Sequence, residues 1–109
     1  MKIVYIAHKI SGNIPENLQK IKRIIRHINL SCPDIIPFAH YVVDCESLDD
    51  DNPQERERGI KNDMEFFQRG FIDELWICSE ISSGILNEIN TANKFGIKVI
   101  DSQDYFKNI

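Results

Sequence analysis

Short apolar runs alternate along the chain with longer segments in which apolar positions recur at a helical period. The run at 2–7 has almost no polar alternation, which is typical of a strand covered on both faces. Similar runs predict three further strands, at 35–39, 74–79 and 97–101. Apolar residues spaced by three and four predict amphipathic helices over 15–30, over 53–69 and from Gly84 to about 94, with a last short helix over 103–107.

The order of these elements predicts an α/β fold built on an open, three-layer parallel sheet. Strands and helices alternate without a repeat or a linker, so we expect a single domain over 1–109 with a sheet of four or five strands. Helices should cover both faces, as in flavodoxin-like and Rossmann-like folds. Pro37 predicts that the second strand lies at an edge or ends there. Ligands bind at the carboxyl ends of such strands, which here are 8–12, His40, 79–84 and Asp101.

The acidic segment at 44–52 has neither a helix nor a strand period. We predict a solvated loop there, with a lid over the strand ends as the alternative. Asn52 and Pro53 form a good start for the helix that follows, and Gly70 a good end.

Charge and cysteine content narrow the class of function. The net charge of −4 disfavours a nucleic-acid polymer as partner, although a single nucleotide remains possible. Cys32, Cys45 and Cys78 are odd in number and form no CxxC pair, so we expect neither a disulfide framework nor a metal site. Reduced thiols, the lack of a membrane-spanning stretch and a start that begins directly with a strand favour the cytoplasm.

The segment Ser82-Ser83-Gly84-Ile85-Leu86-Asn87-Glu88 carries the most chemical information. Two hydroxyls and a glycine lead into a helix, and Gly84 and Glu88 share one helix face because they are four apart. Free N–H groups at a helix start favour an anionic group such as phosphate, and glycine lets a ligand approach the backbone. The simpler alternative is an N-capping serine followed by a glutamate that faces solvent.

Two further polar residues interrupt apolar surroundings. Asp63 lies beside Met64 in the predicted helix 53–69, where it either faces the core or lies on the wet face. Tyr5 lies in the middle of the first strand. Its hydroxyl either bonds to the backbone inside the core or holds a carboxylate near the strand ends.

These residues form a recurrent set of motifs along the chain: Tyr5-Ile6-Ala7, the helix led by Asp63, an acidic residue before the strand at 74–79, Ser82-x-Gly84-x-x-x-Glu88, Ala92, and a last strand introduced by Gly96. In order and spacing the set resembles the nucleoside 2-deoxyribosyltransferase superfamily, which includes nucleotide N-glycosidases. The likeness is greatest to small uncharacterised members with a Pro-Phe-x-His second strand, here Pro37 to His40, and an acidic stretch before an arginine-containing helix, here Asp49 to Arg58.

The resemblance implies roles for these residues. Glu88 would be the nucleophile that attacks the anomeric carbon, Asp63 would protonate or orient the leaving nucleobase, and Tyr5 would hold the glutamate. Ser82 and Gly84 would contact the 5′ side of the sugar or its phosphate, with Ser83 as a further hydroxyl donor. The resemblance also implies a homo-oligomer.

The strand ends supply further candidate substrate contacts: Ala7, His8, Lys9, Gly12 and His40. Lys9 could pair with a phosphate, and the two histidines could carry protons or contact the base. Solvated or structural roles are the alternatives for all three side chains.

The sequence therefore predicts an N-glycoside hydrolase or base-exchanging transferase for a nucleoside, a nucleotide or a related molecule. The alternative is a non-catalytic module on the same fold that senses or sequesters a nucleotide-derived ligand. We expect no cofactor and no membrane partner. A phosphorylated receiver is disfavoured because His8 stands where an acidic residue is needed, and a flavin carrier because the loop at 8–13 is poor in Ser and Thr.

Overall fold

The computed structural model describes residues 1–109 and has an α/β fold with a four-stranded, all-parallel sheet. The elements in chain order are β1 (Lys2–Ala7), α1 (Ile14–Ser31), β2 (Ile35–Phe38), α2 (Tyr41–Ser47), α3 (Pro53–Gln68), β3 (Glu74–Ile77), α4 (Ser83–Lys94), β4 (Lys98–Asp101) and α5 (Gln103–Phe106). The strands lie in the order β2-β1-β3-β4. This is a flavodoxin-like open sheet, and the predicted fold class is confirmed.

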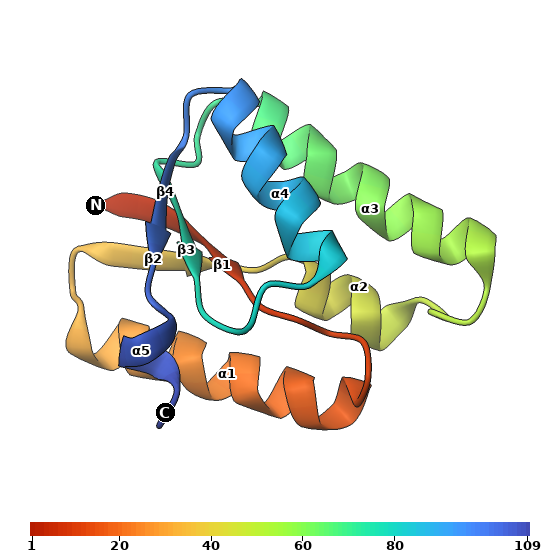
Figure 1. Ribbon diagram of the computed structural model, residues 1–109, viewed down its shortest axis with the longest axis horizontal. Helices are drawn as coiled ribbons and strands as arrows, with labels where there is room; N and C mark the ends of the chain where they lie inside the picture. Colours follow the sequence, from red (N-terminus) through yellow and green to blue (C-terminus); the bar gives the residue numbers. More distant parts are fainter.

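The sheet is the middle of three layers. Figure 1 shows α1 and α5 on one side of it and α3 and α4 on the other. Strand β2 lies at an edge, which explains why it tolerates Pro37, a residue without a backbone N–H. No helix is long and apolar enough to span a membrane.

Strand β1 is central, pairing with both β2 and β3, and its side chains alternate between two buried clusters. Tyr5 and Ala7 belong to the larger one, together with Phe67 of α3 and Ile85 of α4. Val4 and Ile6 belong to the smaller one, whose other members include Ile24 of α1 and Phe106 of α5. Burial of both faces explains the apolar character of this strand.

The three long helices, α1, α3 and α4, begin at residues whose side chains cap them. Asn13 accepts a hydrogen bond from Glu16 N, Asn52 from Gln54 N and Glu55 N, and Ser82 from Ile85 N. Gly70 follows α3 with a φ of 78°, a conformation that other residues rarely adopt. The predicted bounds of the three long helices are therefore correct to within about two residues.

The prediction of a solvated loop over 44–52 is wrong in its first half. Residues Tyr41–Ser47 form α2. Burial of Tyr41 and Val42 stabilises this helix against the core, and the Tyr41 hydroxyl donates a hydrogen bond to the carbonyl of Ile6. A helix of seven residues is too short to show a clear period, and Asp44 and Glu46 made the segment resemble a loop.

Candidate active site

A cavity of about 330 Å³ lies at the carboxyl end of β1. Its walls come from the loop after β1, from α2 and the loop that follows it, from α3 and from the first turns of α4. The lining includes His8, Ile10, Ser11, Tyr41, Asp44, Cys45, Leu48, Asp50, Glu55, Arg56, Gly59, Ile60, Asp63, Met64, Ser82, Ser83, Gly84, Ile85, Asn87 and Glu88. Its position is the one that an open parallel sheet predicts for a ligand.

Three side chains from distant parts of the chain meet beside this cavity. Tyr5 is fully buried, and its hydroxyl oxygen lies 3.1 Å from Asp63 Oδ2 and forms a short hydrogen bond with Glu88 Oε2. The hydroxyl carries one proton and cannot donate to both carboxyl groups. When both bonds form, one carboxyl group must itself be protonated. The alternative in which Glu88 faces bulk solvent therefore does not describe this arrangement.

Burial raises the pKa of both carboxyl groups. The pKa of Glu88 rises to about 8, because burial disfavours its charged form, and the hydrogen bond from Tyr5 only partly opposes this. The pKa of Asp63 rises to about 6 for the same reason, with a further contribution from Asp44. Burial therefore favours the protonated form of both carboxyl groups, and the two groups can share protons through the Tyr5 hydroxyl. Such a coupled pair of carboxyl groups is typical of acid–base sites.

The ring of Tyr5 is fixed by aromatic neighbours. Its centroid lies 4.8 Å from that of Phe67 in α3 and 5.7 Å from that of Tyr41 in α2. The Tyr41 hydroxyl also donates a hydrogen bond to the carbonyl of Ile6. Helix α2 therefore helps to fix the position of Tyr5, which contacts both carboxyl groups. Sequence reasoning missed Tyr41, which follows immediately after the predicted strand end at His40.

The start of α4 forms another part of the cavity wall. Ser82 Oγ accepts a hydrogen bond from Ile85 N at 3.3 Å, so this hydroxyl caps the helix while lining the cavity. Ser83 and Gly84 also line it. A Cβ atom built on Gly84 would meet only Ser82 Oγ, at 3.8 Å, so the protein itself does not require glycine there. The space beside the Gly84 backbone is open to a ligand.

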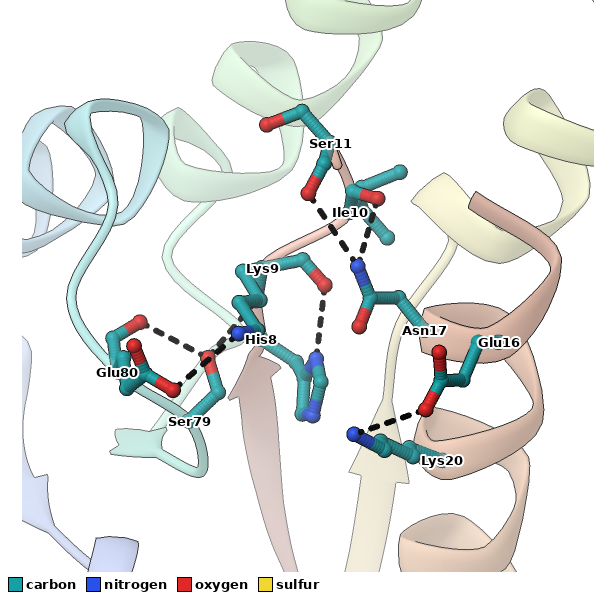
Figure 2. Close-up of polar contacts among 9 residues, drawn as sticks. All are labelled: His8, Lys9, Ile10, Ser11, Glu16, Asn17, Lys20, Ser79 and Glu80. Carbon is teal, nitrogen blue, oxygen red and sulfur yellow. Dashed lines mark hydrogen bonds and ion pairs between the residues drawn. The ribbon is translucent and has the colours of Figure 1, made fainter. Parts of the chain in front are cut away.

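The loop after β1 contributes less to the cavity than predicted. Figure 2 shows Lys9 turned toward the loop after β3, where its Nζ pairs with Glu80 Oε1 at 3.2 Å and its N–H donates to Ser79 Oγ. Neither Lys9 nor Gly12 lines the cavity. His8 does, and its Nδ1 lies 2.8 Å from the carbonyl oxygen of Lys9. Burial lowers the pKa of His8, which favours the neutral imidazole.

Two other candidate contacts lie outside the lining. Ala7 is fully buried in the core beneath the cavity. His40 lies 3.6 Å from Asp44 Oδ1 through its Nε2, with its ring against that of Phe66. His40 therefore reaches the cavity only through its contact with Asp44, which does line it.

The lining also contains charged residues that were not singled out as contacts: Asp44, Asp50, Glu55 and Arg56, from α2, the following loop and α3. The acidic stretch before an arginine-containing helix was the available signal. No group of three or more His, Cys, Asp or Glu side chains is arranged to hold a metal ion.

Chemically, the site combines a carboxyl group that can attack carbon, a second that can move a proton, and a hydroxyl that connects them. The comparisons with known proteins add a family. Residues 2–102 match the model of a family described as a domain of unknown function (DUF7768). No curated protein and no solved structure gives a significant match.

Proposed function

Because the match spans nearly the whole chain, the protein belongs to the DUF7768 family, and from the geometry of its site we propose that it cleaves N-glycosidic bonds. The substrate would be a nucleoside, a nucleotide or a related small molecule. Water as the acceptor makes the protein a hydrolase, and a second base makes it a transferase.

One observation carries this proposal: the Tyr5 hydroxyl hydrogen-bonds with the carboxyl groups of both Asp63 and Glu88 beside a cavity of about 330 Å³. Cleavage of an N-glycosidic bond builds positive charge on the sugar and negative charge on the base. A carboxylate stabilises or traps the first, and an acid neutralises the second. The site holds one group for each task.

The hydrogen bonds give the site a route from its resting state to the reactive one. Glu88 donates its proton to the Tyr5 oxygen while the Tyr5 hydroxyl proton passes to Asp63. Glu88 is then an anion and Asp63 an acid. The two products of this exchange are the nucleophile and the proton donor that the reaction needs.

Bond making and breaking then follow. A Glu88 oxygen forms a bond to the anomeric carbon as the bond from that carbon to the base breaks. The electron pair leaves with the base nitrogen, which receives the proton from Asp63. Water next attacks the anomeric carbon, releases Glu88 and returns a proton to Asp63. A second base can attack in place of water.

Binding without turnover is the second candidate function. It is favoured by the burial of Glu88, which raises its pKa and so favours the protonated form, a poor nucleophile. If no substrate drives the proton exchange, the same cavity holds a ligand and leaves its glycosidic bond intact.

The test is a chromatographic screen for free base released from nucleosides and nucleotides. The wild type should release base, and Glu88→Gln should reduce turnover by about a thousandfold or more while keeping ligand affinity. Glu80→Gln is the matched control, because Glu80 lies outside the cavity lining and is mostly exposed. No release from any compound, or full activity in Glu88→Gln, contradicts the proposal. Binding with no release supports the second candidate.

We also propose that the protein is a cytoplasmic homo-oligomer. All three cysteines are free thiols, and Ile60, Ile81 and Leu86 are 55%, 50% and 52% exposed near the cavity. Sedimentation of the purified protein tests the assembly, and a monomer at high concentration contradicts it.

A further inference from the structure

The charged groups around the cavity are mainly acidic. Among the lining residues, five carry carboxyl groups, and the only lysine or arginine is Arg56. His8 adds no positive charge in its neutral form, and Glu88 adds no negative charge in its protonated form, which leaves Asp44, Asp50, Glu55 and Asp63 against Arg56. The cavity therefore presents a negative potential to an entering ligand, which is strongest for the part of the ligand with the most negative charge. The five acidic residues are Asp44, Asp50, Glu55, Asp63 and Glu88.

The predicted phosphate contacts in the loop after β1 lie away from the cavity, and those at the start of α4 are partly engaged. Lys9 pairs with Glu80 on the other side of the loop, and Gly12 does not line the cavity. At the start of α4, one backbone N–H already has a partner, because Ile85 N donates to Ser82 Oγ. Glu88 follows in the next turn. A phosphate on α4 would therefore approach carboxyl groups with few cations to balance its charge.

A second observation points to the chemistry of the ligand. Asp63 is 9% exposed and lines the cavity, and its Oδ1 atom is buried without any hydrogen-bond partner. A buried acceptor without a donor destabilises the protein, and a bound N–H or O–H group would remove that defect. A phosphate dianion brings only acceptors, so the group that would lie beside Asp63 Oδ1 is a nucleobase or a sugar hydroxyl and not a 5′-phosphate.

We propose that the site selects an unphosphorylated N-glycoside and discriminates against its 5′-phosphate, and that Asp50 and Glu55 are the residues that set this preference. This inference rests on the proposed function for the reaction, but its subject is the charge of the ligand. Asp50 is exposed and Glu55 half-buried. Both can repel a phosphate without taking part in the chemistry.

Arg56 supplies the competing hypothesis. It follows Glu55 in α3, lines the cavity and forms no ion pair. A single guanidinium that held a phosphate would make the monophosphate the better ligand. The two hypotheses predict opposite effects when Arg56 is replaced by glutamine.

The experiment compares each common 2′-deoxynucleoside with its own 5′-monophosphate. For any base that is released, kcat/KM should be more than about tenfold higher for the nucleoside. Asp50→Asn with Glu55→Gln should raise kcat/KM for the monophosphate by about five- to tenfold and change the nucleoside value by less than about twofold. High salt should reduce the ratio of kcat/KM for the nucleoside to kcat/KM for the monophosphate, because salt screens exposed charges.

The matched control is Asp51→Asn with Glu57→Gln. It removes the same charge from neighbouring residues that do not line the cavity, and it should leave both substrates unaffected. Equal or better use of the monophosphate by the wild type overturns the inference. So does a loss of monophosphate activity alone in Arg56→Gln.

Binding separates the failure of this inference from the failure of the proposed function. If no compound is cleaved, calorimetric titration of the wild type with the same pairs still measures the preference. Tighter binding of the nucleoside supports the charge selection even though the reaction is then contradicted. Equal or tighter binding of the monophosphate, or no binding of either member, overturns it.

Discussion

The two faces of the sheet bury similar amounts of β1 and use it differently. Val4 and Ile6 pack against α1 and α5 in a small cluster that is entirely apolar. On the other face, Tyr5 and Ala7 lie in the larger cluster, but Tyr5 ends in a hydroxyl that contacts two carboxyl groups. The first face stabilises the fold by apolar burial alone. The second includes buried polar groups, which stabilise a fold less than apolar side chains of similar size.

The contrast shows why the site lies on one side of the strand. Successive side chains of β1 point to opposite faces of the sheet. Val4 and Ile6 on one face can therefore serve packing alone, while Tyr5 on the other face can serve the chemistry of the site. Substitutions that interchange these properties should therefore affect stability on one face and turnover on the other.

Among the substitutions, the largest effect on stability is expected from Ile6→Ala. Ile6 is fully buried on the apolar face, and loss of its side chain leaves a cavity, so the free energy of unfolding should fall by about 3–4 kcal/mol. Urea denaturation measures this change. The folded protein should keep its kcat, and a loss of kcat without a loss of stability would contradict the separation of the two faces.

Tyr5→Phe should reduce turnover strongly and stability only slightly, the reverse of Ile6→Ala. The ring still fills the core between Tyr41 and Phe67, but both carboxyl groups lose the hydroxyl that connects them. We expect kcat to fall by about a hundredfold and the free energy of unfolding by only about 1 kcal/mol. Steady-state kinetics and urea denaturation of the same preparation test both values. A fully active Tyr5→Phe protein would remove the proton route from the mechanism.

The pH dependence of stability should come from the polar face. Burial raises the pKa of Glu88 from 4.5 to about 8 and that of Asp63 from 3.8 to about 6. The native protein therefore binds more protons than the unfolded chain between these limits, so stability is highest at acid pH and falls as the pH rises through 8. The expected loss between about pH 5 and pH 8.5 is about 5 kcal/mol.

Thermal unfolding across this range measures the slope. Glu88→Gln should flatten most of it, because glutamine does not titrate, whereas Ile6→Val should shift the curve without changing its shape. Stability that rises with pH in the wild type would contradict the raised pKa of Glu88.

The smallest effect is expected from Lys9→Met. Lys9 pairs with Glu80, whose side chain is 84% exposed, so the loss of this ion pair should change stability by less than about 0.5 kcal/mol. Turnover should change by less than about twofold, since Lys9 does not line the cavity. A large loss of activity with a phosphorylated substrate alone would instead give Lys9 the phosphate contact that its place after β1 had predicted.

Much of the fold was accessible from the sequence, because burial on two faces leaves a strong signal. The continuous apolar run of β1 and the capped start of α3 at Asn52 identified those elements to within a residue. Helix α2 was missed because seven residues cannot establish a period and Asp44 has the appearance of a loop residue.

The site was only partly accessible. Spacing alone left Glu88 open to a solvated role and Asp63 to the wet face of its helix, and only the resemblance to a known family suggested that they meet at Tyr5. The orientation of Lys9 could not be predicted, because it depends on Glu80 in a loop that is distant along the chain. Local sequence does not encode such tertiary pairings.

The polar junction at Tyr5 also has a consequence for the time course of folding. Its two hydrogen bonds span 58 and 83 residues, so they join the first strand to helices near the middle and the end of the chain. Contacts of such long range form only after much of the topology is in place. During synthesis, Tyr5 leaves the ribosome first, and its two hydrogen bonds can form only after Asp63 and Glu88 have also been synthesised. Recovery of catalytic competence after refolding should therefore lag behind the return of helical circular dichroism.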